Sequence, residues 1–187
     1  MIFLSASVPI FGRQYYDTSN PAAITSAVKA FARVCAEYQL EVYFGGHPSI
    51  TPLLLRTGMT VDRDFGRLVH IYQSHEFDGM TPIELSEYAN PHWTKKMANR
   101  AESLKHMRET MISESPTECA VFIGGMEGIP AEADLIDKYH PKAKIIPIGA
   151  GGGAAYTLLE RYGIHDDLLK DSMAFIDIFR RYLKDFK

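Results

Sequence analysis

The residues best suited to chemistry lie in segment 123–132, which reads IGGMEGIPAE. Its glycines would let a ligand approach the backbone closely. A helix that begins near Pro130 would point free amides and the positive end of its dipole toward the same place. This combination suits an anion such as a phosphate, although a tight strand-to-helix turn also requires glycine. The phosphate-binding candidates in this segment are Gly124, Gly125, Met126 and Gly128.

Two acidic residues accompany these glycines. Glu127 interrupts the glycine run, and Glu132 follows it at the start of the expected helix. A carboxylate beside a ribose could hold its hydroxyls, or it could stabilise the oxocarbenium-like charge that forms when an N-glycosidic bond breaks. The alternative is that both are first-turn acids favoured by the helix dipole. Glu132 and Glu127 are therefore the candidates for a catalytic role.

A second glycine cluster occupies segment 149–155, which reads GAGGGAA. The spacing of Gly149, Gly151 and Ala154 formally matches the dinucleotide-binding fingerprint. The match carries little weight because the segment follows the last expected strand rather than the first. We favour a flexible loop that contacts phosphate over a segment needed for packing alone. Its candidate binding residues are Gly151, Gly152 and Gly153.

Two more segments place polar groups after expected strands. In the sequence FGGHP, at residues 44–48, the histidine could bond a phosphate or a ribose, or it could cap the next helix. After the first expected strand come small hydroxyls and then a guanidinium, which is suited to bidentate phosphate contact. An isolated arginine is more often a solvated surface residue. The candidates from these two segments are Gly45, Gly46, His47, Ser5, Ser7 and Arg13.

Several well-known chemical signatures are missing from the sequence. It contains no GxxxxGK[ST], HExxH, CxxC or GxSxG motif. The phosphate-binding loop of NTPases is thereby excluded, and zinc hydrolysis, dithiol redox chemistry and α/β-hydrolase chemistry have no support. The histidines are dispersed, and Cys35 and Cys119 are expected to be reduced thiols that pack in the interior. We therefore expect no metal site and no cofactor.

Periodicity and turn residues divide the chain into alternating strands and helices. Five strands are expected at residues 2–8, 40–44, 68–72, 119–123 and 144–148. Helices are expected at residues 21–38, 48–57, 93–113, 130–139 and 152–186, the last interrupted near Gly163. Asn20 followed by Pro21 is a typical helix start. Segment 73–94 is polar and is expected to form a long excursion with at most short helices.

These elements predict one α/β domain with a Rossmann-like, doubly wound and mainly parallel sheet of about five strands, covered by helices on both faces. Three of the strands end in glycine clusters at the carboxyl edge, where open α/β sheets bind ligands. In the strand order 3-2-1-4-5, the loops after the first and fourth strands face each other. We therefore expect Ser7 to approach Gly125. The single domain spans residues 1–187, with a core at 2–160 and a helical tail at 161–187.

The composition restricts the classes of protein that remain. The chain has 187 residues, is 46% hydrophobic and 23% charged, and carries a formal net charge of -3. These values are close to the averages for globular proteins and differ from those of disordered or coiled-coil chains. No basic excess favours a nucleic-acid duplex as partner, and no apolar run is long enough to cross a membrane. The amino-terminal sequence lacks the pattern of a signal peptide, so we expect a cytoplasmic protein.

Four segments together resemble the SLOG superfamily, named after the Smf/DprA proteins and the cytokinin-activating LOG enzymes, and more narrowly its cluster 3 branch. They are FLSASVP, FGGHPSITPLL, VFIGGMEGIPAEADL and PIGAGGGAA, and they span residues 3–155. The resemblance implies a Rossmann-like sheet with a pocket for a nucleotide or a ligand derived from one. Such domains occur in bacterial conflict systems, where they are thought to sense signals made from NAD or related nucleotides.

The LOG-type relatives cleave the N-glycosidic bond of nucleoside monophosphates, and their motif is PGGxGTxxE. In this chain Gly124 and Gly125 match the glycine pair, whereas Gly128 and Glu132 match the later residues only if one residue is inserted. Ile129 replaces the threonine, and an isoleucine replaces the leading proline. These departures weaken the implication of LOG-type hydrolysis and leave that of ligand binding intact.

Three functional hypotheses follow. The first is a sensor that binds a nucleotide or NAD-derived ligand, such as an ADP-ribose-type signal, for antiviral defence, and passes the signal on through homo-oligomers or a separate effector protein. The second is an enzyme, namely an N-glycosidase or ribosyltransferase that uses Glu132 or Glu127. The third is an interaction subunit with a vestigial pocket. In the first two, Tyr72 or Trp93 could stack on the base.

Overall fold

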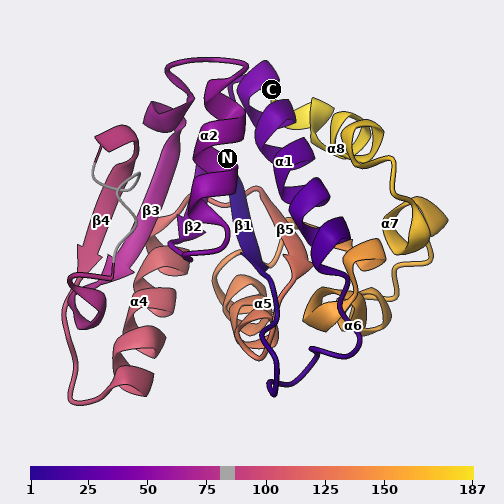
Figure 1. The fold of residues 1–187 in the computed structure, drawn as a ribbon. Coiled ribbons are helices and arrows are strands. Elements are labelled where there is room, and N and C mark those ends of the chain that lie inside the picture. Colours follow the sequence, from indigo (N-terminus) through magenta and orange to yellow (C-terminus); the bar gives the residue numbers. More distant parts are fainter. Residues whose placement is uncertain (81–86) are drawn as a thin grey trace.

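The computed structural model describes residues 1–80 and 87–187, and its centre is one parallel sheet (Figure 1). The strands lie in the order β4-β3-β2-β1-β5-β6, and every neighbouring pair is parallel. Their bounds are β1 Ile2–Ser7, β2 Val42–Gly45, β3 Val69–Ser74, β4 Asn90–Thr94, β5 Cys119–Gly124 and β6 Lys144–Ile148. The predicted Rossmann-like α/β fold is thus confirmed, with six strands instead of about five.

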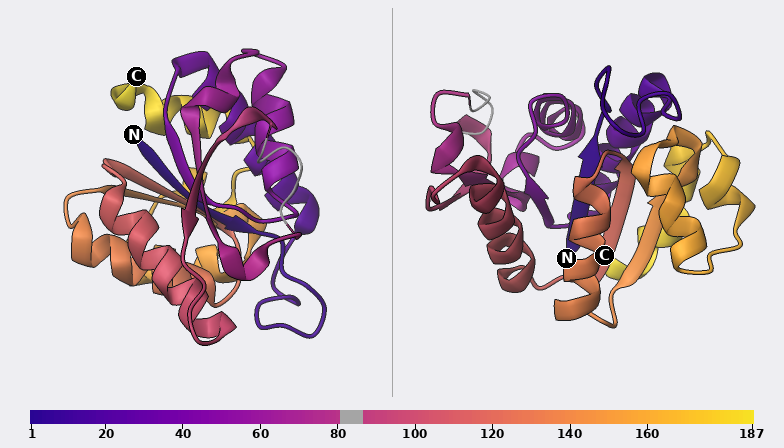
Figure 2. Two further views of the ribbon diagram at one scale, coloured as in Figure 1. Left: turned by 90° about the vertical axis from the view of Figure 1, so that its left-hand side faces the viewer. Right: turned by 90° about the horizontal axis from the view of Figure 1, so that it is seen from below.

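Helices cover both faces of this sheet (Figure 2). Their bounds are α1 Pro21–Tyr38, α2 Thr51–Met59, α4 Arg100–Glu114, α5 Gly128–Tyr139, α6 Gly153–Arg161, α7 Asp167–Asp171 and α8 Phe175–Leu183. Short 3-10 turns lie at η1 Phe65–Leu68, η2 His75–Phe77, η3 Gly149–Gly151 and η4 Lys184–Phe186. In the part of the chain that the structure describes, no helix is both long and apolar enough to cross a membrane.

Two apolar cores result from the alternation of side chains along each strand. Ile2 and Leu4 of β1 pack into one core with α1, α2, α7 and α8, whereas Phe3 packs into the other with α4, α5 and α6. The tail helix α8 lies on α1, and its Phe179 ring meets Phe31 edge to face with 5.4 Å between centroids. The apolar residues of this tail therefore belong to the core.

The carboxyl ends of β1 and β5 meet where the sheet changes its direction of winding. Ser7 pairs with Gly124 in the register of the two strands, and the amide of Gly125 donates to the carbonyl oxygen of Ser7 at 2.8 Å. The expected approach of Ser7 and Gly125 is confirmed. The β1–α1 loop, residues 8–20, therefore leaves the sheet beside the start of α5, at the bottom of Figure 1.

The main difference from the sequence prediction is the edge strand β4. Segment 73–94, which contains β4, is expected from the sequence to be an excursion without strands. The reason is that Pro91 and the polar residues around it are untypical of a strand. An edge strand tolerates proline, since one side of its backbone needs no partner. The helix α4 consequently begins at Arg100 rather than near residue 93, and Asn99 caps it by accepting from the amide of Glu102 at 2.9 Å. Residues 81–86 of the expected excursion lie outside the described residues.

Helix starts also differ by a few residues in two places. Helix α2 begins at Thr51 and α5 at Gly128, so that Pro130 is the third residue of α5 rather than the first. Helix α1 follows its prediction, and the Asn20 side chain accepts from the amide of Ala23 at 3.1 Å. The expected tail helix is three helices, with Gly163 at a positive φ of 59° after α6.

Candidate functional site

A cavity of about 560 Å³ lies at the carboxyl ends of β1, β2 and β3, between α4 and the start of α5. Residues of α4 from Arg100 to Arg108 and of α5 from Gly128 to Glu132 line it. The sequence candidates that line it come from the strands β1 and β2, the three loops that follow β1, β2 and β5, and the helix α5. They are Ser5, Ser7, Arg13, Gly45, Gly46, His47, Met126, Glu127, Gly128 and Glu132.

An arginine that the sequence analysis did not single out pairs with Glu132 inside this cavity. The Nε of Arg108, on α4, donates to Glu132 Oε1 at 3.0 Å, and the Glu132 side chain is 13% exposed. Burial raises the pKa of the Glu132 carboxyl, and Arg108 and Ser5 oppose that shift. The cavity therefore holds a carboxyl group whose charge depends on its pairing with Arg108.

The guanidinium of Arg108 lies close to the first residue of α5, Gly128. A Cβ built on Gly128 would lie 2.6 Å from Arg108 Nη2, which is closer than real Cβ contacts. Gly128 thus lets the guanidinium lie directly against the first turn of α5, where free amides and the helix dipole favour an anion. An anion placed there would meet both the helix amides and Arg108.

A second ion pair stands at the mouth of the same cavity. Arg13 Nη2, from the β1–α1 loop, lies 3.0 Å from Glu127 Oε2, and both side chains are about half exposed. The pKa of Glu127 is lowered by a hydrogen bond from its own backbone amide and then by Arg13. Arg13 and Arg108 therefore both lie beside the start of α5, one from the β1–α1 loop and one from α4.

His47 lies just before α2 and lines the cavity, and its expected contact with a phosphate or a ribose stays a prediction. Its carbonyl oxygen accepts from the amide of Thr51 at 2.9 Å, at the start of α2, and its ring lines the cavity. The amide and hydroxyl of Ser49 both lie within hydrogen-bond distance of Nδ1, at 3.3 and 2.9 Å. Because a backbone amide can only donate, Nδ1 is an acceptor and the neutral ring carries its proton on Nε2. Burial lowers the pKa of His47, which keeps the ring neutral.

Three candidate glycines lie behind the cavity rather than in its lining. Gly124 and Gly125 have positive φ angles of 63° and 79°. A Cβ on Gly124 would meet Ile24 Cδ1 at 2.4 Å, and one on Gly125 would meet Ile129 Cδ1 at 2.2 Å. Gly151 packs against Ile24 in the same way, at 3.0 Å. These glycines shape the turn that presents Met126, Glu127 and Gly128.

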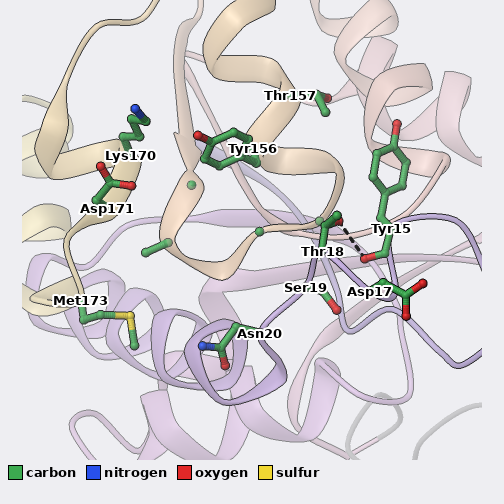
Figure 3. Close-up of a pocket in the computed structure, with 14 residues that line it drawn as sticks. Tyr15, Asp17, Thr18, Ser19, Asn20, Tyr156, Thr157, Lys170, Asp171 and Met173 are labelled. Atoms are coloured by element: carbon green, nitrogen blue, oxygen red, sulfur yellow. Dashed lines mark hydrogen bonds between the residues drawn. The ribbon is translucent and has the colours of Figure 1, made fainter.

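The last two candidates belong to another cavity, of about 620 Å³, which shares no lining residue with the first. Gly152 and Gly153 lie there at the start of α6, with Tyr156 and Lys170 nearby (Figure 3). A Cβ on Gly153 would lie 2.7 Å from the carbonyl carbon of Gly124, so the two glycine clusters touch back to back. The structure thus separates the phosphate candidates into two cavities.

Several lining residues were not predicted as site residues. Leu104 and Met107 line the cavity from α4. The other unpredicted residues whose contacts matter below are Gln73, Phe77, Arg100 and Arg108. Only the position of Gln73 at the end of a strand carried a sequence signal. The residues of α4 depend on how that helix docks on the sheet, and Phe77 lies on η2, which the sequence did not predict.

The aromatic residues considered for base stacking have other partners. Tyr72 is 3% exposed and stacks on the ring of His92 with 4.5 Å between centroids. Trp93 stacks on His75 at 5.1 Å. Neither residue lines the cavity, whereas Phe77 does. The guanidinium of Arg100 lies 5.2 Å from the centre of the Phe77 ring.

The chemistry of the cavity is that of a site for an anion attached to a less polar group. Three arginines and two glutamates line it, beside the apolar side chains of Phe77, Met80, Leu104 and Met107. Among residues 1–80 and 87–187, no group of three or more His, Cys, Asp or Glu side chains could hold a metal ion. The lining supplies charge through guanidinium groups and helix amides.

Comparison with known proteins gives one family. A search of curated proteins found no match. The model of the SLOG cluster3 family matches residues 14–183, which include α5, the whole lining of the second cavity, the part of the first cavity's lining that follows residue 13, and the α7–α8 tail. Three of the four resembling segments lie within the match, and the Rossmann-like sheet agrees with the fold that they implied. The chain therefore belongs to the SLOG cluster 3 family.

Proposed function

We propose that the cavity beside β1, β2 and β3 binds a nucleotide-type ligand, with its phosphate at the start of α5. The observation that carries this proposal is that two arginines of one cavity lie beside that helix start, Arg13 in an ion pair with Glu127 and Arg108 against Gly128. Guanidinium groups and free helix amides are the groups that proteins use for phosphate. Membership of the SLOG family supports a nucleotide-related function at the family level.

The two ion pairs differ in how readily they release their arginine. Arg13 and Glu127 are half exposed, so water screens their attraction and an incoming phosphate would compete for Arg13 easily. Arg108 and Glu132 are 26% and 13% exposed, and that pair would stay intact because only the Nε of Arg108 is used by Glu132. The phosphate would thus replace Glu127 as the partner of Arg13. It would also accept hydrogen bonds from the Nη groups of Arg108, which keeps its pairing with Glu132.

Within this binding role we propose the detection of a signal. The ligand would be a nucleotide or NAD-derived molecule, such as an ADP-ribose-type signal, and the setting would be a bacterial conflict or antiviral defence system, as is thought for other SLOG domains. The exchange at Arg13 would move the β1–α1 loop when ligand binds. Self-association or a separate effector protein would then carry the signal onward.

A second candidate function is cleavage of an N-glycosidic bond. It is favoured by one observation, the buried Glu132 carboxyl with its raised pKa in the same cavity as the proposed phosphate position. A carboxyl of this kind could stabilise or protonate groups at the glycosidic carbon. The substrate would be NAD or a nucleotide, and the enzyme would be an N-glycosidase or a ribosyltransferase.

A ligand screen with product analysis separates these functions. Thermal unfolding is measured with NAD, ADP-ribose, cyclic ADP-ribose, AMP, IMP and nicotinamide mononucleotide, and each mixture is then analysed by chromatography for free base. Binding at a hundredfold excess over Kd stabilises the fold by about 2.7 kcal/mol. Stabilisation with intact ligand supports a sensor, and release of base supports an enzyme. Failure of every nucleotide to stabilise the protein would overturn the proposal.

A pair of arginine variants tests the proposed position of the phosphate. Arg13→Ala removes a half-exposed guanidinium at the cavity mouth and is expected to weaken nucleotide binding strongly. Arg33→Ala is the matched control, because Arg33 also forms an exposed ion pair, with Glu37 at 3.1 Å, but lies on α1 away from the cavity. Equal affinities of the two variants would contradict the assignment.

A further inference from the structure

We infer that Gln73 recognises the base of the ligand, and that it does so as a hydrogen-bond donor to a carbonyl oxygen. This inference rests on the proposed function and narrows its ligand class. Gln73 is at the carboxyl end of β3, lines the cavity and is only 5% exposed. A polar side chain that is buried to this extent normally has its hydrogen bonds satisfied, so an unused group on it points to a missing partner.

The backbone fixes which end of the Gln73 amide is free. The amide of Ser74 donates to Gln73 Oε1 at 3.1 Å. Because a backbone N–H must donate, the atom that it meets is the oxygen, which settles the orientation of the side-chain amide. The Nε2 group has no hydrogen-bond acceptor among residues 1–80 and 87–187. Gln73 therefore offers the cavity a donor, while its oxygen is already occupied.

The surroundings keep this donor accessible from the cavity. Nε2 would lie 3.3 Å from a Cβ on Gly46, so the absence of a side chain at Gly46 leaves room beside the amide. Phe77, Leu104 and Met107 line the same cavity. A ligand that covers this donor without accepting a hydrogen bond displaces water from it and leaves it unpaired, so the donor discriminates between ligands through the cost of desolvation.

The separation from the phosphate position suits a nucleoside. The start of α5 lies beside the end of β1, and Gln73 lies at the end of β3, two strands away in the sheet. Two spacings between neighbouring strands amount to about 10 Å. A phosphate at Gly128 and the far edge of its base would be separated by a similar span. The sugar would then lie over β1 and β2, near Ser5 and Gly45.

The donor selects between bases by what they present at that edge. A carbonyl oxygen, as in a 6-oxopurine or in the carboxamide of nicotinamide, accepts from Nε2. The exocyclic amino group of adenine is itself a donor, so a base that places this group at Nε2, where a 6-oxopurine places its carbonyl oxygen, forms no hydrogen bond there. We therefore expect the cavity to prefer a carbonyl-bearing base over an amino-bearing one of the same size.

The test compares ligands that differ mainly at this edge. Affinities of the full chain for IMP, AMP and nicotinamide mononucleotide are measured by calorimetry. IMP and nicotinamide mononucleotide should bind at least about tenfold more tightly than AMP, because AMP would leave the buried donor unpaired. Whichever of the two binds more tightly shows whether the recognised carbonyl belongs to a 6-oxopurine or to a carboxamide. Gln73→Glu keeps the acceptor for Ser74 and replaces the donor by an acceptor, so it should remove that preference.

Two further variants make the outcome decisive. Gln14→Glu makes the same chemical change on an exposed residue outside the cavity and should leave the ratio of affinities unchanged. If Gln73→Glu does not fold, Gln73→Met removes the donor at similar length and should also equalise the ligands. This inference alone is overturned if the unchanged protein binds all three ligands equally. It is also overturned if the preference for the carbonyl-bearing ligands survives the substitution of Gln73. Absence of binding by every ligand overturns the proposed function as well.

Discussion

The guanidinium of Arg108 lies against the α-carbon of Gly128, so a residue of α4 covers the first turn of α5. This contact joins two elements that are separated by the strand β5 in sequence. It places a cation where the helix dipole already favours an anion. Position 128 thus matters through the space that it leaves for Arg108, and its φ is not positive.

Gly128→Ala is the substitution that isolates this contact. The new Cβ would displace Arg108 Nη2, the end of a flexible side chain, so the free energy of unfolding should change by less than about 1 kcal/mol. Nucleotide affinity should fall about tenfold or more, because the guanidinium leaves the helix start. Chemical denaturation and calorimetry measure the two effects. A large loss of stability with unchanged affinity would show that Gly128 serves packing only.

Glu132→Gln separates catalysis from binding. The amide keeps the shape of the carboxyl and can still accept from Arg108, so nucleotide binding should persist. Any release of base should drop by at least about a hundredfold, the smallest usual effect of losing an acid or base catalyst. Chromatography of NAD or nucleotide incubations gives the rates. A variant that cleaves as fast as the unchanged protein would remove Glu132 from a catalytic role.

Two histidines should make stability depend on pH near neutrality. Burial lowers the pKa of His70, with the nearby His92 adding to the shift, and burial lowers that of His47. A histidine whose pKa is lowered by folding binds fewer protons in the folded state, so its stabilising contribution is complete above the unfolded pKa of about 6.5. It is lost as the pH falls below 6.5 toward the folded pKa.

The contribution of His70 can be measured by difference. The free energy of unfolding of the unchanged protein and of His70→Asn is determined by denaturation at pH 7.5 and 5.5. The loss of stability on acidification should be smaller in His70→Asn, and the comparison of the two proteins cancels the titration of the carboxylates. An identical loss in both would mean that the contact of His70 Nδ1 with His92 Nε2, at 3.1 Å, does not depend on protonation.

A substitution in the second cavity is expected to leave nucleotide binding unchanged. Lys170 and Tyr156 line it, and it shares no residue with the cavity that holds Arg13 and Arg108. If the ligand occupies only the latter, Lys170→Ala should leave nucleotide affinity within about twofold. Calorimetry with the tightest ligand of the screen decides this. A tenfold loss would mean that the ligand also reaches Gly152 and Gly153, as the glycine run first suggested.

Five strands of the sheet could be predicted from the sequence because they are short apolar runs, three of which are followed by glycine clusters. The approach of Ser7 and Gly125 followed from strand order alone, and the amide of Gly125 lies 2.8 Å from the carbonyl oxygen of Ser7. The edge strand β4 was missed because Pro91 and its polar neighbours lack the pattern of a buried strand. An edge position removes the need for that pattern.

The site was only partly predictable for a related reason. Loop residues such as Arg13 and Glu127 stand next to glycines and could be singled out locally. Arg108 could not, because its place in the cavity depends on the packing of α4 against the sheet. Gln73 offered only its position at the end of a strand. Glycine runs also gave an ambiguous signal. Gly124 and Gly125 are required by backbone conformation and by contact with Ile24 and Ile129. A glycine needed for these reasons cannot be distinguished, from the sequence alone, from a glycine that contacts phosphate.

The phosphate site is tested most directly by comparing a nucleotide with its nucleoside. The affinities of IMP and inosine, and of AMP and adenosine, are measured for the unchanged protein and for Arg108→Ala. The phosphate should contribute at least about tenfold to affinity, and Arg108→Ala should remove most of this difference while the fold is retained. Equal affinities for nucleotide and nucleoside in the unchanged protein would contradict a phosphate site at the start of α5.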